Sequence, residues 1–484
     1  MSAATNAAPP LPDGLVAFVK RDCPTCALVA PVLRQLRESG ARLTVYTQDD
    51  PLFPAGLEPV DDTALEASWL HAIETVPTLL RVEGGAVAAR TVGWSRAQWE
   101  AFTGAKGLGP ALPEHRPGCG SLSADPERAD ALSVRFRAGS LQSRRVELAR
   151  LEDEHEALFE RGWTDGLPVV PPTEARVLRM LAGTTRAPGE VVALVPPDLA
   201  PATVEKVAVN AVMAGCKPEH LPVVLAALEA ACTDEFNMHG LLATTMPVGP
   251  VVIVNGPIRR AIGMNAGVNV LGQGNRAHLA IGRALQLVVR NVGGGRPGEV
   301  DRATHGSPGK LSFCFPEDEE GSPWEPLSVE RGFAEGASTV TLFAGEGTRC
   351  VVDQLSRTPE SLAATLAASL ATLHHPKLAM AFDAVLVIGP EHARVFREAG
   401  WSKARLLEEL HARLLRPGAD LVRGAGGIAE GVPEYLRDAM LPKFRPGGLL
   451  LVHAGGSAGL FSEIIGGWVN GDIGSQPVTK EIKP

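Results

Sequence analysis

The residues with the clearest chemistry are two cysteines near the N-terminus, in the stretch Cys23-Pro24-Thr25-Cys26. An apolar run typical of a buried strand precedes them at residues 15–19, and the apolar positions of residues 27–36 indicate an amphipathic helix. A cysteine at a helix start lies beside unpaired backbone N–H groups, which stabilise its thiolate. The other cysteine lies one turn further on, where it can resolve a mixed disulfide. The stretch therefore predicts a redox-active dithiol, with Cys23 as nucleophile and Cys26 as resolving thiol.

A proline further along supports this interpretation. Pro77 stands at the head of an apolar run typical of a strand, a place where proline is tolerated. The Cys-x-x-Cys together with Val76-Pro77-Thr78 resembles the thioredoxin/glutaredoxin family. The resemblance covers residues 14–105 and implies that Pro77 is cis, faces the disulfide and shapes the binding cleft. A hairpin turn at Gly84-Gly85 and a closing helix over residues 94–102 complete the expected domain.

Two other interpretations of the cysteine pair stay open at this point. The pair can be half of a zinc site, although the chain has no second Cys-x-x-Cys to supply the other two sulfurs. The domain can also be a thioredoxin-like fold that is kept only for binding. We predict no metal and no organic cofactor, and the redox-active group is the Cys23–Cys26 disulfide.

The length, net charge and cysteine content of the whole chain limit the class of protein to which it can belong. Its 484 residues predict two or three domains, and its net charge of −9 argues against nucleic acid as a partner. Seven cysteines in this length suit a reducing compartment. Residues 1–12 lack the regions of a signal peptide, and the apolar residues 447–469 are interrupted by His453 and Glu463, so no membrane span is expected. We expect a cytoplasmic protein with a small-molecule substrate and a cellular thiol reductant as partners, and leave open a homo-oligomer.

The rest of the chain predicts a second, larger domain. Residues 106–125 are dense in Gly and Pro, which indicates a linker. Cys119 lies within it, and two roles stay open: a relay thiol for the dithiol, or an incidental cysteine. Over residues 126–484 strand and helix patterns alternate, which predicts an α/β fold with a mixed, partly parallel sheet and room for two subdomains. We expect helices over residues 144–162 and from residue 460.

Three segments of the larger domain carry candidate site residues. These segments are residues 234–239, 263–276 and 453–459, and each is polar or rich in glycine and adjoins an apolar strand or helix. An unpaired buried polar group costs roughly 1–3 kcal/mol, so we expect all three segments to line one solvated cleft. A glycine and asparagine loop before a helix can hold a polar or anionic substrate, and loops at strand ends gather at binding sites. The acid–base candidates are Asp234, Glu235 and His239, and the substrate-binding candidates are Asn237, Asn265, Asn269, Gly272, Gly274, Asn275, Arg276, His453, Gly455, Gly456 and Ser457.

Other residues receive simpler interpretations. Two cysteines of the larger domain are candidates for a thiol that exchanges with the Cys23–Cys26 pair. Cys216 lies at a break between two helices, and Cys314 lies between two aromatic residues. Cys232 lies in an alanine-rich helix and is expected to be buried and structural. The acidic residues 317–320 are expected to form a solvated loop.

The larger region also resembles proteins that carry a UGSC-like domain, named for a selenocysteine-Gly-Ser-Cys motif after a strand. The resemblance rests on residues 163–173, residues 213–219 and the closing glycine loop. Gly455-Gly456-Ser457-Ala458 stands where redox-active residues of that motif would stand, so no mechanism is carried over.

Together these features predict a thiol–disulfide module fused to a catalytic α/β domain that acts on a small polar or anionic substrate with electrons from the dithiol. The main alternative is a lyase, hydratase or metal-dependent enzyme, in which the thioredoxin-like part docks or regulates. Asp234, Glu235, His239 and His453 would then be candidate ligands, although their spacing matches no standard metal motif. A thiol-based sensor without turnover is a third hypothesis.

Overall fold

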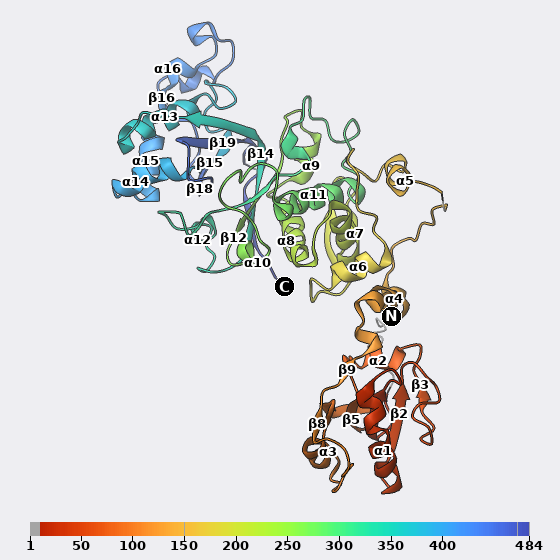
Figure 1. The fold of residues 1–484 in the computed structure, drawn as a ribbon. Coiled ribbons are helices and arrows are strands. Elements are labelled where there is room, and N and C mark those ends of the chain that lie inside the picture. The colour runs from red at the N-terminus through yellow and green to blue at the C-terminus, as the bar shows by residue number, and fades with distance from the viewer. Residues whose placement is uncertain (1–9, 150, 472, 484) are drawn as a thin grey trace. The chain divides into compact units, whose positions relative to one another are not determined.

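The computed structural model describes residues 10–149, 151–471 and 473–483. The chain divides into two compact units, with the boundary between Leu141 and Gln142 (Figure 1). The α/β class predicted from the sequence is confirmed, because the first unit holds a small mixed sheet and the second a larger mixed, partly parallel sheet. Among the described residues, no helix is both long and apolar enough to cross a membrane.

The first unit is built on a sheet with the strand order β3-β2-β1-β5-β6. The first three strands run parallel to one another, while β5 is antiparallel to β1 and β6 is antiparallel to β5. This parallel start, with helix α1 between β1 and β2, is consistent with a thioredoxin-like beginning. The elements are β1 (Gly14–Val19), α1 (Pro24–Glu38), β2 (Leu43–Thr47), β3 (Val60–Asp61), α2 (Glu66–Leu70), β5 (Thr78–Glu83), β6 (Ala86–Val92), α3 (Arg96–Thr103) and α4 (Pro126–Arg137).

The stretch predicted as a linker, residues 106–125, lies within the first unit. Strand β8 (His115–Arg116) pairs with β7 (Trp94–Ser95), and β9 (Cys119–Gly120) pairs with β4 (Thr75–Val76). Close backbone approach accounts for glycine here, because a Cβ on Gly118 would lie only 2.4 Å from Cγ2 of Thr75. Gly118 thus marks tight packing, whereas Gly107 and Gly120 have open space where a Cβ would lie.

The second unit is organised around a sheet with the strand order β13-β12-β14-β19-β15-β18, to which β20 adds by pairing with β14. Strands β12 and β13 are parallel, as are β15 and β18, and the long strands β14 and β19 join the two pairs through antiparallel ladders. The strands are β12 (Gly249–Asn255), β13 (Cys314–Pro316), β14 (Thr339–Val352), β15 (Phe382–Ile388), β18 (Leu449–His453), β19 (Phe461–Val469) and β20 (Val478–Glu481).

The helix expected from residue 460 is wrong, since this segment is strand β19. Ile464 and Ile465 of this strand are buried between the neighbouring strands β14 and β15. Gly467 allows the close approach of β15, because a Cβ there would lie 2.6 Å from the carbonyl oxygen of Asp383.

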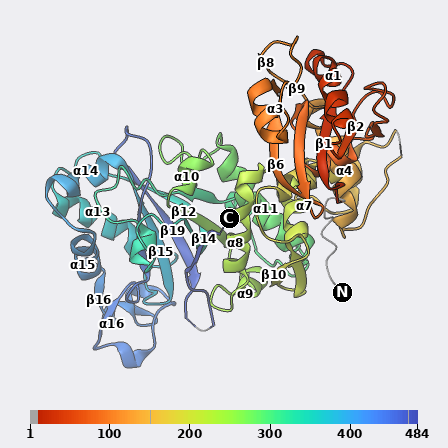
Figure 2. The ribbon, with the colours of Figure 1, turned by 90° about the horizontal axis from the view of Figure 1, so that it is seen from below.

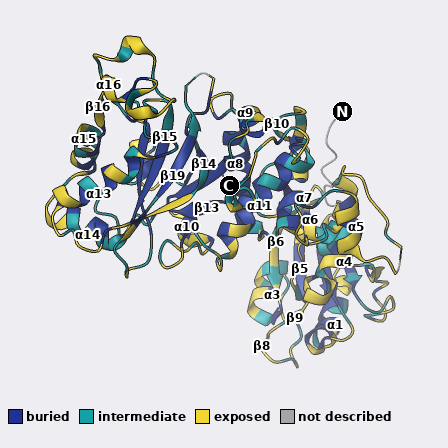
Figure 3. Ribbon diagram, turned by 90° about the horizontal axis from the view of Figure 1, so that it is seen from above, coloured by how far each residue is buried: buried dark blue, intermediate teal, exposed yellow. Residues whose placement is uncertain are grey.

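Helices cover this sheet in two groups. Helix α8 packs against β14 and β20 with α11 beside it on β13, while α13 packs against β14, α14 against β19 and α15 against α13 (Figures 1 and 2). Figure 3 shows the strands between them as largely buried, while the outer faces of the helices are exposed. The helices are α5 (Glu154–Glu160), α6 (Glu174–Leu181), α7 (Val204–Ala214), α8 (Leu221–Ala231), α9 (Met238–Ala243), α10 (Ile258–Ala261), α11 (Arg276–Asn291), α12 (Leu327–Glu330), α13 (Pro359–Ala371), α14 (Pro390–Glu398), α15 (Lys403–Arg413) and α16 (Gly418–Leu421), and the short strands are β10 (Val191–Val195), β11 (Ala200–Thr203), β16 (Leu415–Pro417) and β17 (Met440–Pro442).

The predicted helix over residues 144–162 is shorter than expected. Only α5 is helical, and residues 144–149 have no regular structure. Just before them, the backbone N–H groups of Gln142 and Ser143 donate to the carboxylate of Glu205. The guanidinium of Arg145 pairs with the carboxylate of Glu174. These tertiary contacts hold the segment extended despite its helical composition.

The exposed, irregular segment after the unit boundary predicts where a protease cuts first. We expect trypsin to cleave native protein after Arg144 or Arg145, which are exposed, before it cleaves after Lys106, because the side chains of Gln35 and Glu100 hold the two residues that follow Lys106. Fragment masses over a time course measure this order. A double variant with glutamine at both positions should resist the first cut, and first cleavage within residues 106–125 would contradict the unit boundary.

Candidate functional site

Cys23 occupies the N-cap position of helix α1, as the sequence predicted. Its backbone is extended, and its Sγ accepts a hydrogen bond from the backbone N–H of Cys26 at 3.3 Å. Pro24 follows at the first helical position, where a missing N–H costs nothing. Both sulfurs of the pair are removed from solvent, with Cys23 1% and Cys26 0% exposed.

A third cysteine joins this pair. The Sγ of Cys119 lies 3.0 Å from the Sγ of Cys23, because β9 pairs antiparallel with β4 and places Cys119 opposite Val76. The next peptide bond, Val76–Pro77, is cis, as the family resemblance implied, and the Val76 carbonyl oxygen lies 3.6 Å from the Cys23 sulfur. Of the two roles left open for Cys119, this placement favours a thiol that takes part in the dithiol chemistry.

The three sulfurs differ in acidity for physical reasons. The pKa of Cys23 is lowered to about 5 by hydrogen bonding from the Cys26 side chain, with smaller contributions from the Cys119 thiol and the N–H groups of Cys26 and Thr25, which together outweigh burial. Burial and the Cys23 sulfur raise the pKa of Cys26 far above its ordinary value. Burial, followed by the same neighbour, raises that of Cys119. Cys23 is therefore the thiolate at neutral pH.

This acidity predicts a titration. We expect the thiolate absorbance of one cysteine to persist at neutral pH and to disappear as the pH falls through about 5, since the thiolate form exists above the pKa. The band should be absent from Cys23→Ser. In Cys119→Ala it should titrate at higher pH, because one donor to the sulfur is lost. A wild-type protein whose thiols all titrate above neutral pH would contradict the assignment.

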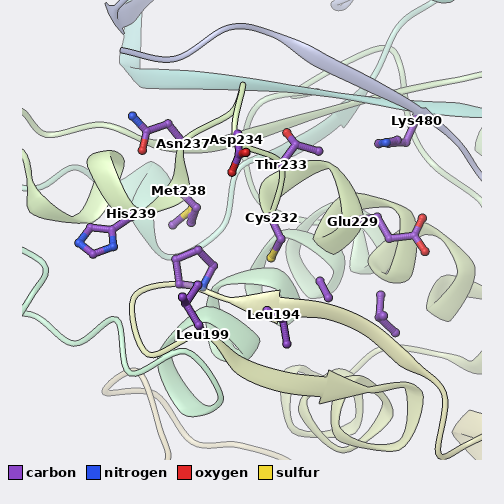
Figure 4. Close-up of a pocket in the computed structure, with 13 residues that line it drawn as sticks. Leu194, Leu199, Glu229, Cys232, Thr233, Asp234, Asn237, Met238, His239 and Lys480 are labelled. Carbon is purple, nitrogen blue, oxygen red and sulfur yellow. The ribbon is translucent and has the colours of Figure 1, made fainter. Parts of the chain in front are cut away.

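The larger unit contains a pocket of about 830 Å³ beside the end of helix α8 (Figure 4). One wall is the β10–β11 hairpin, where Leu194 and Leu199 are 54% and 58% exposed. The other wall is polar and comprises the α8–α9 turn with Lys480 of β20. An exposed apolar wall facing charged and hydroxyl groups suits a ligand with both apolar and polar parts.

Two of the three predicted acid–base residues line this pocket. Asp234 and His239 line it and are exposed, whereas Glu235 is not among its lining residues. Asn237 also lines it, but its amide is occupied: Oδ1 accepts from the N–H of Gly240, and Nδ2 donates to the carbonyl oxygen of Gly474, both at 2.9 Å. Asn237 therefore positions the turn, and Asp234 and His239 are the groups left to meet a ligand.

Some lining residues had no local signal in the sequence. Lys480 reaches the pocket only because β20 pairs with β14, and the apolar hairpin wall depends on its packing beside α8. Cys232 also lines the pocket and is half-buried rather than buried, although burial still raises the pKa of its thiol to about 12.

The asparagine and glycine loop, residues 263–276, is organised by its own side chains. The Asn265 amide bonds to Gly267 and Val268, and the Asn269 amide donates to the carbonyl oxygen of Gln273. Asn275 caps α11 and holds Gly263, and Arg276 Nε donates to the carbonyl oxygen of Gly215. Gly272 makes room for Asn269, since a Cβ there would lie 2.2 Å from its Oδ1, and Gly274 adopts a φ of 113°.

The loop after β18 packs against the 263–276 loop. The N–H of Gly455 donates to the carbonyl oxygen of Ala266 at 2.9 Å, and a Cβ on Gly456 would lie 3.0 Å from Cγ2 of Val268. His453 is buried, with Nδ1 2.9 Å from the carbonyl oxygen of Ile388, and burial lowers its pKa. Ser457 is exposed.

The structure therefore brings together two of the three segments that we expected to share one cleft. The 263–276 and 453–459 loops meet each other, but neither contributes a residue to the lining of the α8–α9 pocket. Residues 234–239 instead contact the chain that leads to β20, where the Gln476 N–H donates to the Glu235 carbonyl oxygen at 2.8 Å.

The cysteines proposed as partners of the dithiol are inaccessible. Cys216 and Cys314 are 6% and 5% exposed. Burial raises the pKa of Cys216 to about 12 and that of Cys314 further still. Their environment favours the neutral thiol.

Only Glu320 of the acidic residues 317–320 is exposed, so most of this run is not the solvated loop that we expected. Glu317 is 1% exposed and accepts from Asn255 and from the N–H of Leu327. Glu319 accepts from Asn255 and pairs with the Arg259 guanidinium at 2.6 Å. Buried donors at the end of β12 thus compensate the carboxylates.

Comparison with models of known protein families found no match, and a search of curated proteins found no similar sequence. Among the described residues, no group of three or more His, Cys, Asp or Glu side chains is placed to hold a metal ion. The geometry of the thiol centre and of the α8–α9 pocket therefore carries the functional argument.

Proposed function

We propose that the first unit is a thiol–disulfide oxidoreductase of the thioredoxin/glutaredoxin type, with Cys23 as its nucleophile. The observation that carries the proposal is the Cys23 sulfur at the start of α1, with a pKa lowered to about 5 and the cis Val76–Pro77 bond beside it. A thiolate at neutral pH is the form that attacks a disulfide. Its low pKa also makes it a good leaving group when the enzyme's own disulfide is reduced.

The proposed exchange balances without a cofactor. The Cys23 thiolate attacks one sulfur of a substrate disulfide, forming a mixed disulfide and releasing a substrate thiolate. Cys26 then attacks the Cys23 sulfur, the Cys23–Cys26 bond forms, and the second substrate sulfur departs with the proton that Cys26 loses. The substrate gains two electrons, the dithiol is oxidised, and a cellular thiol reductant restores it.

The test is the reduction of a small aromatic disulfide by the full-length, reduced protein. We expect the wild type to react rapidly at pH 7, with a rate that falls as the pH drops through about 5, because protonation removes the thiolate. Cys23→Ser should lose this fast reaction.

Cys350→Ser is the matched control for this test. Cys350 is an exposed cysteine of β14, and its removal should leave the fast reaction unchanged. A fast reaction that survives in Cys23→Ser would rule out Cys23 as the nucleophile.

For the second unit we propose a binding role for a small molecule at the α8–α9 pocket. The support is its composition: an apolar hairpin wall faces Asp234, His239 and Lys480. A ligand with an apolar body and an anionic group would place the group near the Lys480 ammonium. The UGSC-like resemblance belongs to this proposal; in its 163–173 segment, Asp165 pairs with Arg283 of α11 at 2.7 Å, which anchors the segment.

This proposal predicts a co-purifying molecule. We expect protein purified under native conditions to release a small anionic compound on denaturation, identified by mass spectrometry. Lys480→Ala should reduce its occupancy, because the only basic side chain among the lining residues other than His239 is removed. Glu481→Ala, on the neighbouring exposed residue of β20, is the control. Equal occupancy in both variants would argue against an anion site at Lys480.

A further inference from the structure

The sulfurs of Cys23, Cys26 and Cys119 differ in solvent exposure. The nucleophile Cys23 and its neighbour Cys26 are almost fully buried, whereas Cys119 is partly exposed. An external thiol therefore reaches the Cys119 sulfur more readily than it reaches the Cys23 sulfur. At the same time, the Cys119 sulfur lies within 3.0 Å of the Cys23 sulfur, close enough for direct exchange between them.

We propose that Cys119 is the thiol through which the oxidised Cys23–Cys26 pair takes electrons from low-molecular-weight thiols. This inference rests on the proposed oxidoreductase function of Cys23, and it adds a third reacting sulfur to that site. The oxidised pair would pass through a Cys23–Cys119 disulfide before it meets the external thiol.

The segment that carries Cys119 is fixed on both sides of the thiol. Before it, Thr25 Oγ1 donates to the carbonyl oxygen of Pro117 at 2.7 Å, and a Cβ on Gly93 would lie 2.9 Å from the Gly118 nitrogen. After it, the Ser121 N–H donates to the carbonyl oxygen of Glu74 at 2.9 Å. These contacts hold the backbone of Cys119 on both sides and so position its sulfur beside that of Cys23.

The same packing indicates the class of substrate. Strand β9 lies antiparallel along β4, with Cys119 opposite Val76, as a cysteine-bearing peptide would lie if it added a strand there. A protein substrate would have to displace this segment before reaching Cys23. A low-molecular-weight thiol needs access only to the partly exposed Cys119 sulfur, so we assign the exchange to small thiols.

The reaction balances in three steps. In the oxidised protein, the Cys119 thiolate attacks Cys23 Sγ, a Cys23–Cys119 bond forms, the Cys23–Cys26 bond breaks, and Cys26 takes up the proton that Cys119 released. A small thiolate then attacks the Cys119 sulfur and expels the Cys23 thiolate. A second small thiolate attacks the resulting mixed disulfide and releases Cys119. Two small thiols become one disulfide, and the protein gains two electrons.

The test uses 2-mercaptoethanol as the probe and the full-length oxidised protein. We measure the rate at which the Cys23–Cys26 disulfide is lost, by acid quenching, alkylation and peptide mass mapping. We expect Cys119→Ser and Cys119→Ala to be reduced more slowly than the wild type by about tenfold or more, while Cys350→Ser matches the wild type. Thermal unfolding of each variant checks that its fold is retained.

A second variant gives an independent readout. Mild oxidation of Cys26→Ser should yield the Cys23–Cys119 disulfide as its main intramolecular product. Unchanged or faster reduction in both Cys119 variants would overturn the inference, the faster result identifying Cys119 as a cover over Cys23. Absence of the Cys23–Cys119 disulfide in oxidised Cys26→Ser would overturn it too. If the wild type never forms a Cys23–Cys26 disulfide, the proposed oxidoreductase function itself fails, which is a separate outcome.

Discussion

The stabilisation of a buried negative charge on one sulfur is the constraint on which the thiol centre depends. Cys23 is nearly inaccessible to water, and burial alone would keep it protonated. Donors around the sulfur reverse this: the thiols of Cys26 and Cys119 and the first N–H groups of α1. The two neighbouring thiols keep their protons, first because burial disfavours a thiolate and then because a second negative charge beside the Cys23 sulfur would be repelled. The three sulfurs therefore differ in protonation, with the negative charge on Cys23.

In the larger unit, too, buried polar groups are stabilised by partners within the fold. Its conspicuous polar residues are mostly engaged within the fold: the asparagines of the 263–276 loop bond to that loop's own backbone, and Glu317 and Glu319 bond to Asn255. Of the predicted acid–base residues, Asp234 and His239 are exposed and line the α8–α9 pocket. A polar residue type at a plausible position therefore says less about function than whether its hydrogen bonds are already made.

The sequence predicted the features that depend on near neighbours. Strand β1, the start of α1 and the dithiol within it follow from a short apolar run, a helix period and one motif. The contact of Cys23 with Cys119 joins residues 96 positions apart and requires Gly93 and Gly118 to admit a close backbone, so local reasoning left it undecided. Strand β19 was predicted as a helix because its apolar run follows a strand and a glycine loop, while its pairing partners β14 and β15 lie far away in the chain. The acidic run at residues 317–320 was misjudged because Arg259 and Asn255, its partners, lie far away in the chain.

The most direct test of the central claim is a redox titration of the full-length protein in dithiothreitol buffers, with alkylation and peptide mapping of every cysteine at each potential. We predict that Cys23 and Cys26 pass together from thiols to a disulfide in one two-electron transition, in which the oxidised-to-reduced ratio changes tenfold for about 30 mV. Cys119 should be a free thiol at both ends of the curve. A protein in which Cys23 remains alkylated as a free thiol across the whole range would contradict the account.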